Sequence, residues 1–212
     1  MSNLAEDRSF ITPAEYYEME RTATEKHDYY QGEIFAMSGG TSNHSRIKTD
    51  MLVEIGLQLK GKQCQPYDSD QRLKILATGL RTYPDTSIYC DELEYDEEDE
   101  QKETATNPTV LIEVLSDSTE AYDRGLKAEN YRQTETLQAY LLVSQNAPHV
   151  EMFERTDGDD WRFTEVRGID AEMTINSIEV TLKLAEIYRR VKFKDQAEPT
   201  PASSSDSAAP TT

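Results

Sequence analysis

The stretch PTVLIEVLS, residues 108–116, constrains the fold of this chain more than any other. Residues 109–116 form the most apolar segment, and they are long enough for a strand at the centre of a sheet with both faces covered. Side chains alternate along a strand, so Glu113 shares a face with Leu111 and Leu115. A buried, unpaired carboxylate costs on the order of several kcal/mol. The pattern therefore predicts that a cation, a metal ion or a proton neutralises Glu113.

The rest of the pattern alternates between helices and strands. Helices are predicted at 11–22, where Thr12, Pro13 and Glu15 suit a capping box, at 41–62, where apolar residues recur every four positions, and at 123–135. Strands are predicted as a hairpin at 27–39 that turns at Gln31-Gly32, as segments 63–68, 70–76 and 82–90, and as a final group that begins at AYLLVSQ. This order predicts an α/β or α+β fold with a mixed sheet.

The length of 212 residues predicts one domain, spanning 11–192. A flexible N-terminus is expected at 1–10, and the Pro-, Ser- and Ala-rich segment 193–212 is expected to be a disordered tail. The net charge is −19, far from that of a usual nucleic-acid-binding protein. Nine acids and one Lys fall in residues 91–103, so 91–105 is predicted to be a solvated acidic loop, and a sharper hypothesis is that it mimics nucleic-acid charge.

Several features bear on the cellular location. No stretch approaches about 18 consecutive apolar residues, so no membrane-spanning helix is expected. The first ten residues lack the hydrophobic region of a secretory signal. The two cysteines, Cys64 and Cys90, indicate neither a disulfide framework nor a zinc site. The sequence thus predicts a protein of the reducing cytoplasm.

Asp85 is the natural companion of Glu113. It follows Pro84 at or near the start of the strand predicted at 82–90. Two carboxylates on neighbouring strands can hold one Mg²⁺, which activates a water and neutralises charge on a leaving group. Lys127 lies on one helix face with Asp123 and Tyr131, and it could orient that water or stabilise a pentacovalent phosphate.

Five stretches together resemble a known family: GEIFAMSGGTSNHSRI, SDQRLKI, TYPDTSIYC, PTVLIEVLSDSTEAYDRGLKAENYRQ and LQAYLLVSQ. They are similar to the Uma-two family, a domain-of-unknown-function family of restriction-endonuclease-like proteins in the PD-(D/E)XK nuclease superfamily. The resemblance covers roughly residues 10–190. It implies a restriction-endonuclease-like mixed central β-sheet flanked by helices. It also implies a Mg²⁺-dependent endonuclease, with Mn²⁺ as a substitute and DNA as substrate, and by analogy a homodimer.

The resemblance also implies residue roles. Asp85 matches the PD aspartate and Glu113 the second metal carboxylate. The superfamily Lys stands two residues after that Glu, where this chain has Leu115, and Lys127 on the following helix is the substitute. Weaker candidates for the same cleft are Glu33, His44, Asp70 and Tyr131.

Simpler interpretations remain open beside these. Asp85 and Glu113 can be a structural acid pair that is protonated or bound to Lys or Arg, and Lys127 can be a surface partner of Asp123. His44 can be a neutral core histidine, and Asp70 a strand-end cap or a partner of Arg72.

Two further functions fit the chain as well. A nuclease-like binding or regulatory module that no longer cuts is suggested by the charge of −19 and by Leu115. A metal phosphoesterase acting on a non-nucleic substrate fits the acidic surface.

Overall fold

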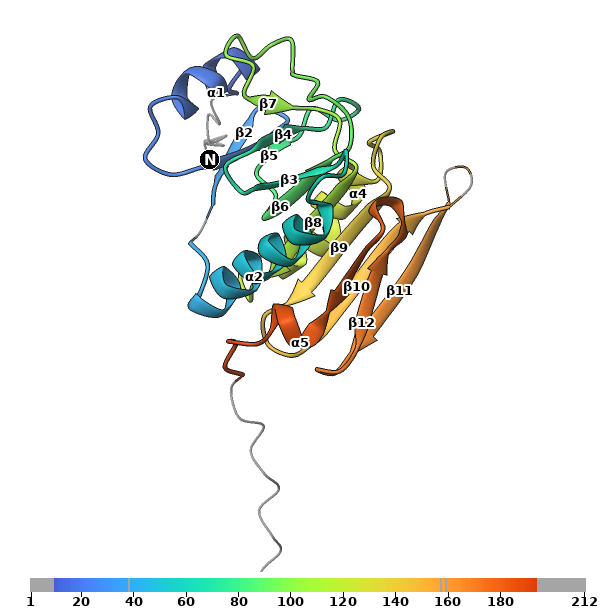
Figure 1. Cartoon of the computed structure of the whole chain (residues 1–212). Coiled ribbons are helices and arrows are strands. Elements are labelled where there is room, and N and C mark those ends of the chain that lie inside the picture. Colours follow the sequence, from blue (N-terminus) through green and yellow to red (C-terminus); the bar gives the residue numbers. More distant parts are fainter. Residues whose placement is uncertain (1–9, 38, 157, 159, 194–212) are drawn as a thin grey trace, which may run out of the picture.

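The computed structural model describes residues 10–37, 39–156, 158 and 160–193 (Figure 1). The flexible N-terminus and the disordered tail expected at 1–10 and 193–212 lie outside the described residues, except for Phe10 and Phe193. The strands form two main sheets, and helix α2 packs against the larger one through contacts with β3 and β8 (Figure 1).

The larger sheet has six strands in the order β11-β10-β9-β8-β6-β3. Strands β8 and β9 are parallel, and the other neighbouring pairs are antiparallel, so the predicted mixed sheet is confirmed. The apolar stretch of the sequence is β8, which lies inside the sheet between β9 and β6. The strands span Gln65–Asp68 (β3), Thr86–Tyr89 (β6), Val110–Leu115 (β8), Ala139–Ser144 (β9), His149–Arg155 (β10) and Trp161–Arg167 (β11).

The smaller sheet has five short strands in the order β2-β1-β5-β4-β7, and β12 and β13 form a separate antiparallel pair. The predicted hairpin is confirmed, because Gln31 and Gly32 both adopt positive φ angles, 50° and 84°, between β1 and β2. The strands span His27–Tyr30 (β1), Glu33–Ala36 (β2), Arg72–Lys74 (β4), Arg81–Thr82 (β5), Thr104–Ala105 (β7), Glu172–Ile175 (β12) and Val180–Lys183 (β13).

The first two predicted helices are confirmed. Helix α1, Pro13–Glu20, begins with the expected capping box between Thr12 and Glu15. Helix α2, Ser42–Leu59, is capped by the side chain of Thr41, which accepts a hydrogen bond from the His44 N–H. A short helix α5, Leu184–Ile187, follows β13. Over the described ranges, no helix combines the length and the apolar character that crossing a membrane requires.

The third predicted helix, 123–135, is wrong in its bounds and its regularity. The segment consists of α3 (Glu120–Tyr122), a π-helical turn η1 (Asp123–Lys127) and α4 (Ala128–Tyr131). In the π turn the Ala128 N–H bonds to the carbonyl of Asp123, five residues earlier. A periodicity of 3.6 residues gives no sign of such a turn, and π turns are often found at functional sites.

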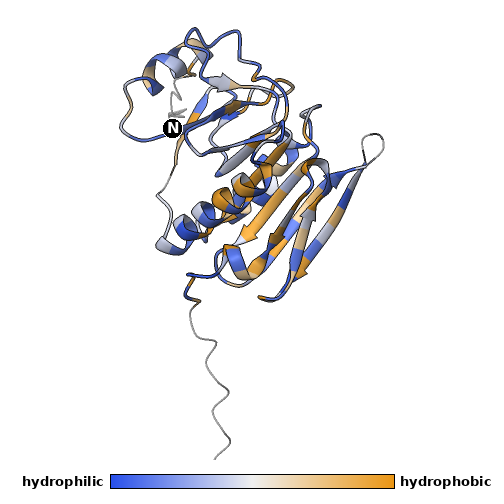
Figure 2. Cartoon of the chain, in the orientation of Figure 1, coloured by the Kyte–Doolittle hydropathy of each residue, from blue (hydrophilic) through white to orange (hydrophobic). Residues whose placement is uncertain are grey.

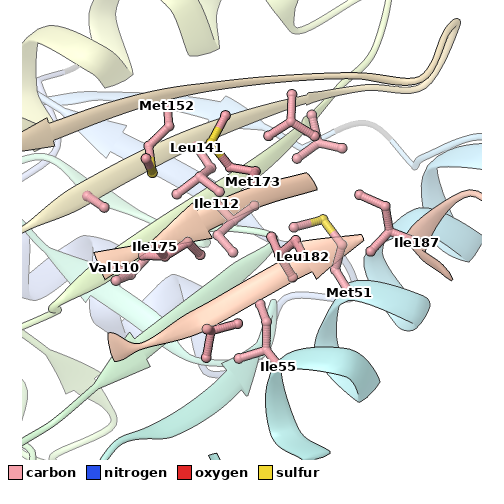
Figure 3. Packing of buried hydrophobic residues seen from close by; sticks show 14 of the residues in the cluster. Met51, Ile55, Val110, Ile112, Leu141, Met152, Met173, Ile175, Leu182 and Ile187 are labelled. Atoms are coloured by element: carbon pink, nitrogen blue, oxygen red, sulfur yellow. The ribbon is translucent and has the colours of Figure 1, made fainter. Parts of the chain in front are cut away.

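The two faces of β8 enter two different cores. Val110, Ile112 and Val114 pack with α2 and with β12 and β13 (Figure 3). Figure 2 shows the apolar stripe of α2 turned toward these strands. Leu111 and Leu115 pack with α4 and β9 on the opposite face. Glu113 lies between Leu111 and Leu115 on the same face of β8. Its side chain therefore points at the segment made of α3, η1 and α4, which we call the broken helix.

The acidic segment 91–105 is only in part the solvated loop that the sequence predicts: most of its acids are exposed, but not all. Asp96 and Asp99 are buried. The segment folds back on the smaller sheet because cations of β4 and β5 meet these two acids. We call this group the loop network; it consists of Arg72, Lys74, Arg81, Asp96 and Asp99. The charge run is therefore partly a structural element.

Cys64 and Cys90 form a disulfide, which the number and spacing of the cysteines did not indicate. Strands β3 and β6 pair so that Gln65 lies opposite Tyr89. The next residues outward, Cys64 and Cys90, are therefore neighbours. The number and spacing of two cysteines carry no signal for such a bond, because it depends on strand register.

Candidate functional site

Asp85 and Glu113 interlock at the start of β6. Asp85 directly precedes β6, which pairs with β8 so that Thr86 lies opposite Ile112. The Asp85 N–H donates to Glu113 Oε2 at 3.2 Å, and the Val114 N–H donates to Asp85 Oδ2 at 2.9 Å. Strand pairing thus brings together the two acids that the sequence singles out.

Glu113 is enclosed by donors from the broken helix. Its Oε1 accepts from Lys127 Nζ at 3.0 Å and from the Tyr131 hydroxyl at 2.8 Å. Burial raises the pKa of Glu113 to about 8, and the nearby Asp123 and Asp85 carboxylates add to the rise while Lys127 opposes it. Glu113 therefore holds a proton far more tightly than a solvated glutamate does.

Lys127 is buried among acids. Its Nζ lies 3.3 Å from Asp123 Oδ1 as well as 3.0 Å from Glu113, and its side chain is 5% exposed. Burial acts to lower the pKa of Lys127, but Glu113, Tyr131, Asp28 and Asp123 outweigh it and hold the pKa well above 10.5. The interpretation of Lys127 as a surface partner of Asp123 is wrong, because both side chains are enclosed.

Asp28 is a buried acid of the site that the sequence reasoning missed. It lies on β1 and is 3% exposed, and its Oδ1 has no hydrogen-bond partner among the described residues. It is close enough to Tyr122 to add to the effect of burial in raising the pKa of that hydroxyl. The available signal was the one used for Glu113, a single acid in an otherwise apolar or aromatic strand, here beside Tyr29 and Tyr30.

Asp85 faces the partly exposed side of the site. His44 Nε2 lies 3.0 Å from Asp85 Oδ2, and Lys48 Nζ lies 3.9 Å from Oδ1. Burial acts to raise the pKa of Asp85, but the His44 contact, the Val114 N–H and Lys127 outweigh it and lower the pKa. His44 is in the first turn of α2, as predicted, and its contact with Asp85 distinguishes it from a histidine that only fills the core.

The remaining predicted residues lie at different distances from this pair. Tyr131 is a core residue whose hydroxyl contacts Glu113 directly. Asp70 pairs with Lys26 at 2.5 Å, whereas Arg72, its expected partner, pairs with Asp99. Glu33 is exposed at the start of β2, so the buried acid of this hairpin is Asp28 instead.

The charges of the site are unbalanced. We call this group the site cluster; it consists of Asp28, Asp85, Glu113, Asp123 and Lys127. Lys127 pairs with Glu113 and Asp123, Asp85 contacts His44 and Lys48 from the partly exposed side, and one oxygen of Asp28 is enclosed without a partner. All the donor atoms of the acids are oxygens, the ligands that Mg²⁺ and Mn²⁺ prefer. The chemistry of the cluster therefore fits a divalent cation.

A second group of ligand-type side chains lies on β10 and β11. One ligand atom each of His149, Glu151 and Glu165 falls within 4.8 Å of the others. Arg124 binds Glu151, and Arg167 binds Glu165 at 2.9 Å. Because these carboxylates already have cationic partners, the group does not show the excess of acid found in the site cluster.

Comparisons with known proteins show which family the chain resembles. Residues 13–185 match the model of the Uma2 family, described as "Putative restriction endonuclease". Two proteins of Synechocystis are similar. The uncharacterized protein slr1290 is 35% identical over 86% of this chain and 94% of its own length, and the uncharacterized protein sll1609 is 32% identical over 80% and 95%.

The fold has a solved counterpart. The crystal structure of a putative nuclease of DUF820 from Anabaena variabilis matches with a TM-score of 0.65 at 15% identity, over 82% of this chain and 97% of that one. At this identity the likeness bears on the fold alone. It confirms the mixed, restriction-endonuclease-like fold that the sequence predicts.

Proposed function

The chain belongs to the Uma2 family of putative restriction endonucleases, and on that premise we propose that it is a Mg²⁺-dependent endonuclease that hydrolyses phosphodiester bonds of DNA. The observation that carries the proposal is the interlocked pair of Asp85 and Glu113 beside the buried Lys127. A structural ion pair needs one acid for one base, whereas this site has acid in excess.

Asp85 and Glu113 are the residues that would hold the metal. A bound Mg²⁺ would polarise the phosphate and make an attacking hydroxide available near neutral pH. Asp85 suits this role because its pKa is lowered and its side chain reaches the exposed side of the site. Glu113 fixes the backbone of Asp85 by accepting its N–H, so loss of either acid disturbs the other.

The other residues position these groups. Tyr131 donates to Glu113 and fixes the rotamer of its carboxylate. Lys127 remains protonated and can stabilise negative charge that develops on a reacting phosphate. It takes the place that Leu115 leaves on β8, where the superfamily pattern has a Lys. His44 orients Asp85 from α2.

A second candidate function is a nuclease-like module that binds a partner and does not cut. The observation that favours it is the enclosure of Glu113, whose two carboxylate oxygens both accept hydrogen bonds from the chain itself. A net charge of −19 points the same way.

Metal titration separates the two. Wild type is titrated with Mn²⁺ by calorimetry beside Asp85→Asn, Glu113→Gln and the control Asp91→Asn, which changes an exposed acid. We expect binding by wild type and by the control, and loss of binding in the two site variants while all remain folded. Metal-dependent nicking of plasmid DNA that Asp85→Asn abolishes would establish the endonuclease. Equal Mn²⁺ binding by all four proteins would contradict the site.

Cytoplasmic location and a homodimer belong to the same proposal. Disulfides are rare in a reducing cytoplasm, so trapping the thiol state of Cys64 and Cys90 in cells tests the location. Sedimentation of the purified protein tests the dimer.

A further inference from the structure

The site cluster is closed on one side and partly open on the other. The side chains of Glu113, Lys127 and Asp123 are 3–5% exposed. Exposure rises to 14% at Asp85 and to 28% at Lys48. A substrate therefore reaches the acids from the side of α2, past Asp85 and Lys48, and not through the broken helix.

Two residues of α2 form this open side. His44 and Lys48 are one helical turn apart, so they project from the same face of the helix. The core residues Ile47 and Met51 of the same helix are fully buried and fix its position against the larger sheet. A rigid helix thus holds both nitrogen groups beside Asp85.

The contacts of Lys48 leave part of the hydrogen-bonding capacity of its ammonium group unused. Its Nζ donates to Ser69 Oγ at 3.0 Å and lies 3.9 Å from Asp85 Oδ1, a distance too long for a strong hydrogen bond. An ammonium carries three donors, so at least one remains for another acceptor. The nearby Lys26, by contrast, binds both Asp70 and the Ser69 carbonyl.

A phosphodiester oxygen is an acceptor that matches the donor left on Lys48. A nucleic acid approaching a chain of net charge −19 is repelled over most of the surface. Lys127 cannot meet it at the surface because it is enclosed by Glu113 and Asp123. Among the described cations that contact the acids of the site cluster, Lys48 has the most exposed side chain.

We propose that Lys48 binds a phosphate of the nucleic-acid substrate at the mouth of the site, next to Asp85. The inference rests on the proposed function and goes beyond it by assigning a substrate contact that neither acid nor Lys127 supplies. Lysine suits such a contact because it acts as a flexible point charge toward phosphate oxygens.

Binding of a fluorescein-labelled DNA duplex tests the proposal. Anisotropy is measured against salt concentration, with Ca²⁺ in place of the catalytic ion, for wild type, Lys48→Met, Lys48→Arg and Lys62→Met. Lys62 follows the same helix and is 42% exposed, so its variant controls for the change in net charge. We expect Lys48→Met to bind about 5- to 10-fold more weakly and to lose roughly one phosphate contact from the salt dependence. Lys48→Arg should restore most of the affinity.

The outcomes separate this inference from the proposed function. If wild type binds and Lys48→Met matches it in affinity and salt slope, the assignment of Lys48 is wrong, while nicking by wild type still supports the endonuclease. If Lys48→Met loses the contact although wild type never nicks DNA, the assignment of Lys48 as a phosphate contact is supported and the proposed endonuclease activity is wrong. Absence of DNA binding by wild type overturns both. Mn²⁺ calorimetry and a thermal melt of Lys48→Met show that the acids and the fold are intact.

Discussion

The loop network and the site cluster are made of the same residue types but differ in their balance. In the loop network three cations meet two buried acids and are also paired with the exposed Glu98 and Glu103, and Asp96 accepts from Arg81, Lys74 and the Tyr17 hydroxyl. In the site cluster Lys127 is the one buried cation for four acids: it pairs with two of them, Asp85 has only the partly exposed His44 and Lys48, and Asp28 keeps an oxygen without a partner. The first arrangement is complete without any other group, whereas the second is not.

The pKa values follow this difference. Burial acts to raise the pKa of Asp96, but hydrogen bonds from Lys74 and Tyr17 outweigh it, so the pKa is lowered. Burial also raises the pKa values of Glu113 and Asp123, and their hydrogen-bond donors do not offset the effect of burial. Burial of an acid therefore does not identify a functional site by itself; a deficit of partners around buried acids does.

The largest expected effect is on the pH dependence of stability. An unfolded chain releases the Glu113 proton near pH 4.5 and the folded protein near pH 8. The stabilisation is therefore complete below pH 4.5 and is lost as pH rises through about 8. At about 1.4 kcal/mol per pKa unit this is a loss of several kcal/mol. Urea unfolding at a series of pH values measures it.

Single variants assign the two ends of this profile. Glu113→Gln should flatten the fall between pH 4.5 and about 8. The pKa of Lys127 lies above 10.5, outside that window. Asp96 has a lowered pKa, so its stabilisation is present above 3.8 and is lost in acid. The pKa of Asp123 is also raised, so a fall toward pH 8 that survives in both Glu113→Gln and Asp123→Asn would contradict the charge imbalance.

The second effect concerns Asp96→Asn. This change removes the buried one of the two carboxylates that Arg81 and Lys74 share and leaves them only the exposed Glu98, and breaking a buried ion pair costs about 3 kcal/mol or more. We expect a loss of that size in the free energy of unfolding by urea, and less than about 0.5 kcal/mol for Glu97→Gln, an exposed acid of the same run. Equal effects of the two changes would mean that the loop network is not structural.

The sequence predicts the strands and helix starts that position the site. The alternation of 109–116 assigns Glu113 to the face it occupies, and the capping residues Thr12 and Thr41 mark the starts of α1 and α2. These features are local, because they depend on strand alternation and on residues within one helical turn. The pairing of Asp85 with Glu113 follows from strand register, and the sequence alone leaves it as a hypothesis.

The parts that sequence reasoning misses depend on distant contacts. Asp28 joins the site cluster only because β1 and the broken helix come together. Asp96 looks like any acid of a charge run, and only packing against Arg81 and Tyr17 makes it structural. A π turn at 123–127 leaves no mark in a helical repeat. None of these has a signature within a short window of sequence.

The third effect is stabilisation by a divalent cation. A ligand at about 100 times its dissociation constant stabilises the folded state by about 2.7 kcal/mol. Mn²⁺ should therefore raise the melting temperature of wild type and of Asp96→Asn alike, because the acids of the loop network are paired with cations and do not bind the ion. Asp85→Asn should show no rise. A rise in Asp85→Asn equal to that of wild type would place the bound ion elsewhere.

The smallest effect has the opposite sign to that of Asp96→Asn. Asp28→Asn makes the same chemical change at a buried acid, but in a group with excess negative charge and at an oxygen without a partner. Removing that charge should raise the free energy of unfolding by about 1 kcal/mol. Asp160→Asn, at an exposed position, controls for the lower net charge of the whole chain. If Asp28→Asn destabilises the protein as Asp96→Asn does, Asp28 is a needed partner of Lys127, and the site cluster is closer to balance than its contacts indicate. If Asp28→Asn raises the free energy of unfolding while Asp96→Asn lowers it, the shortage of cations is specific to the site cluster.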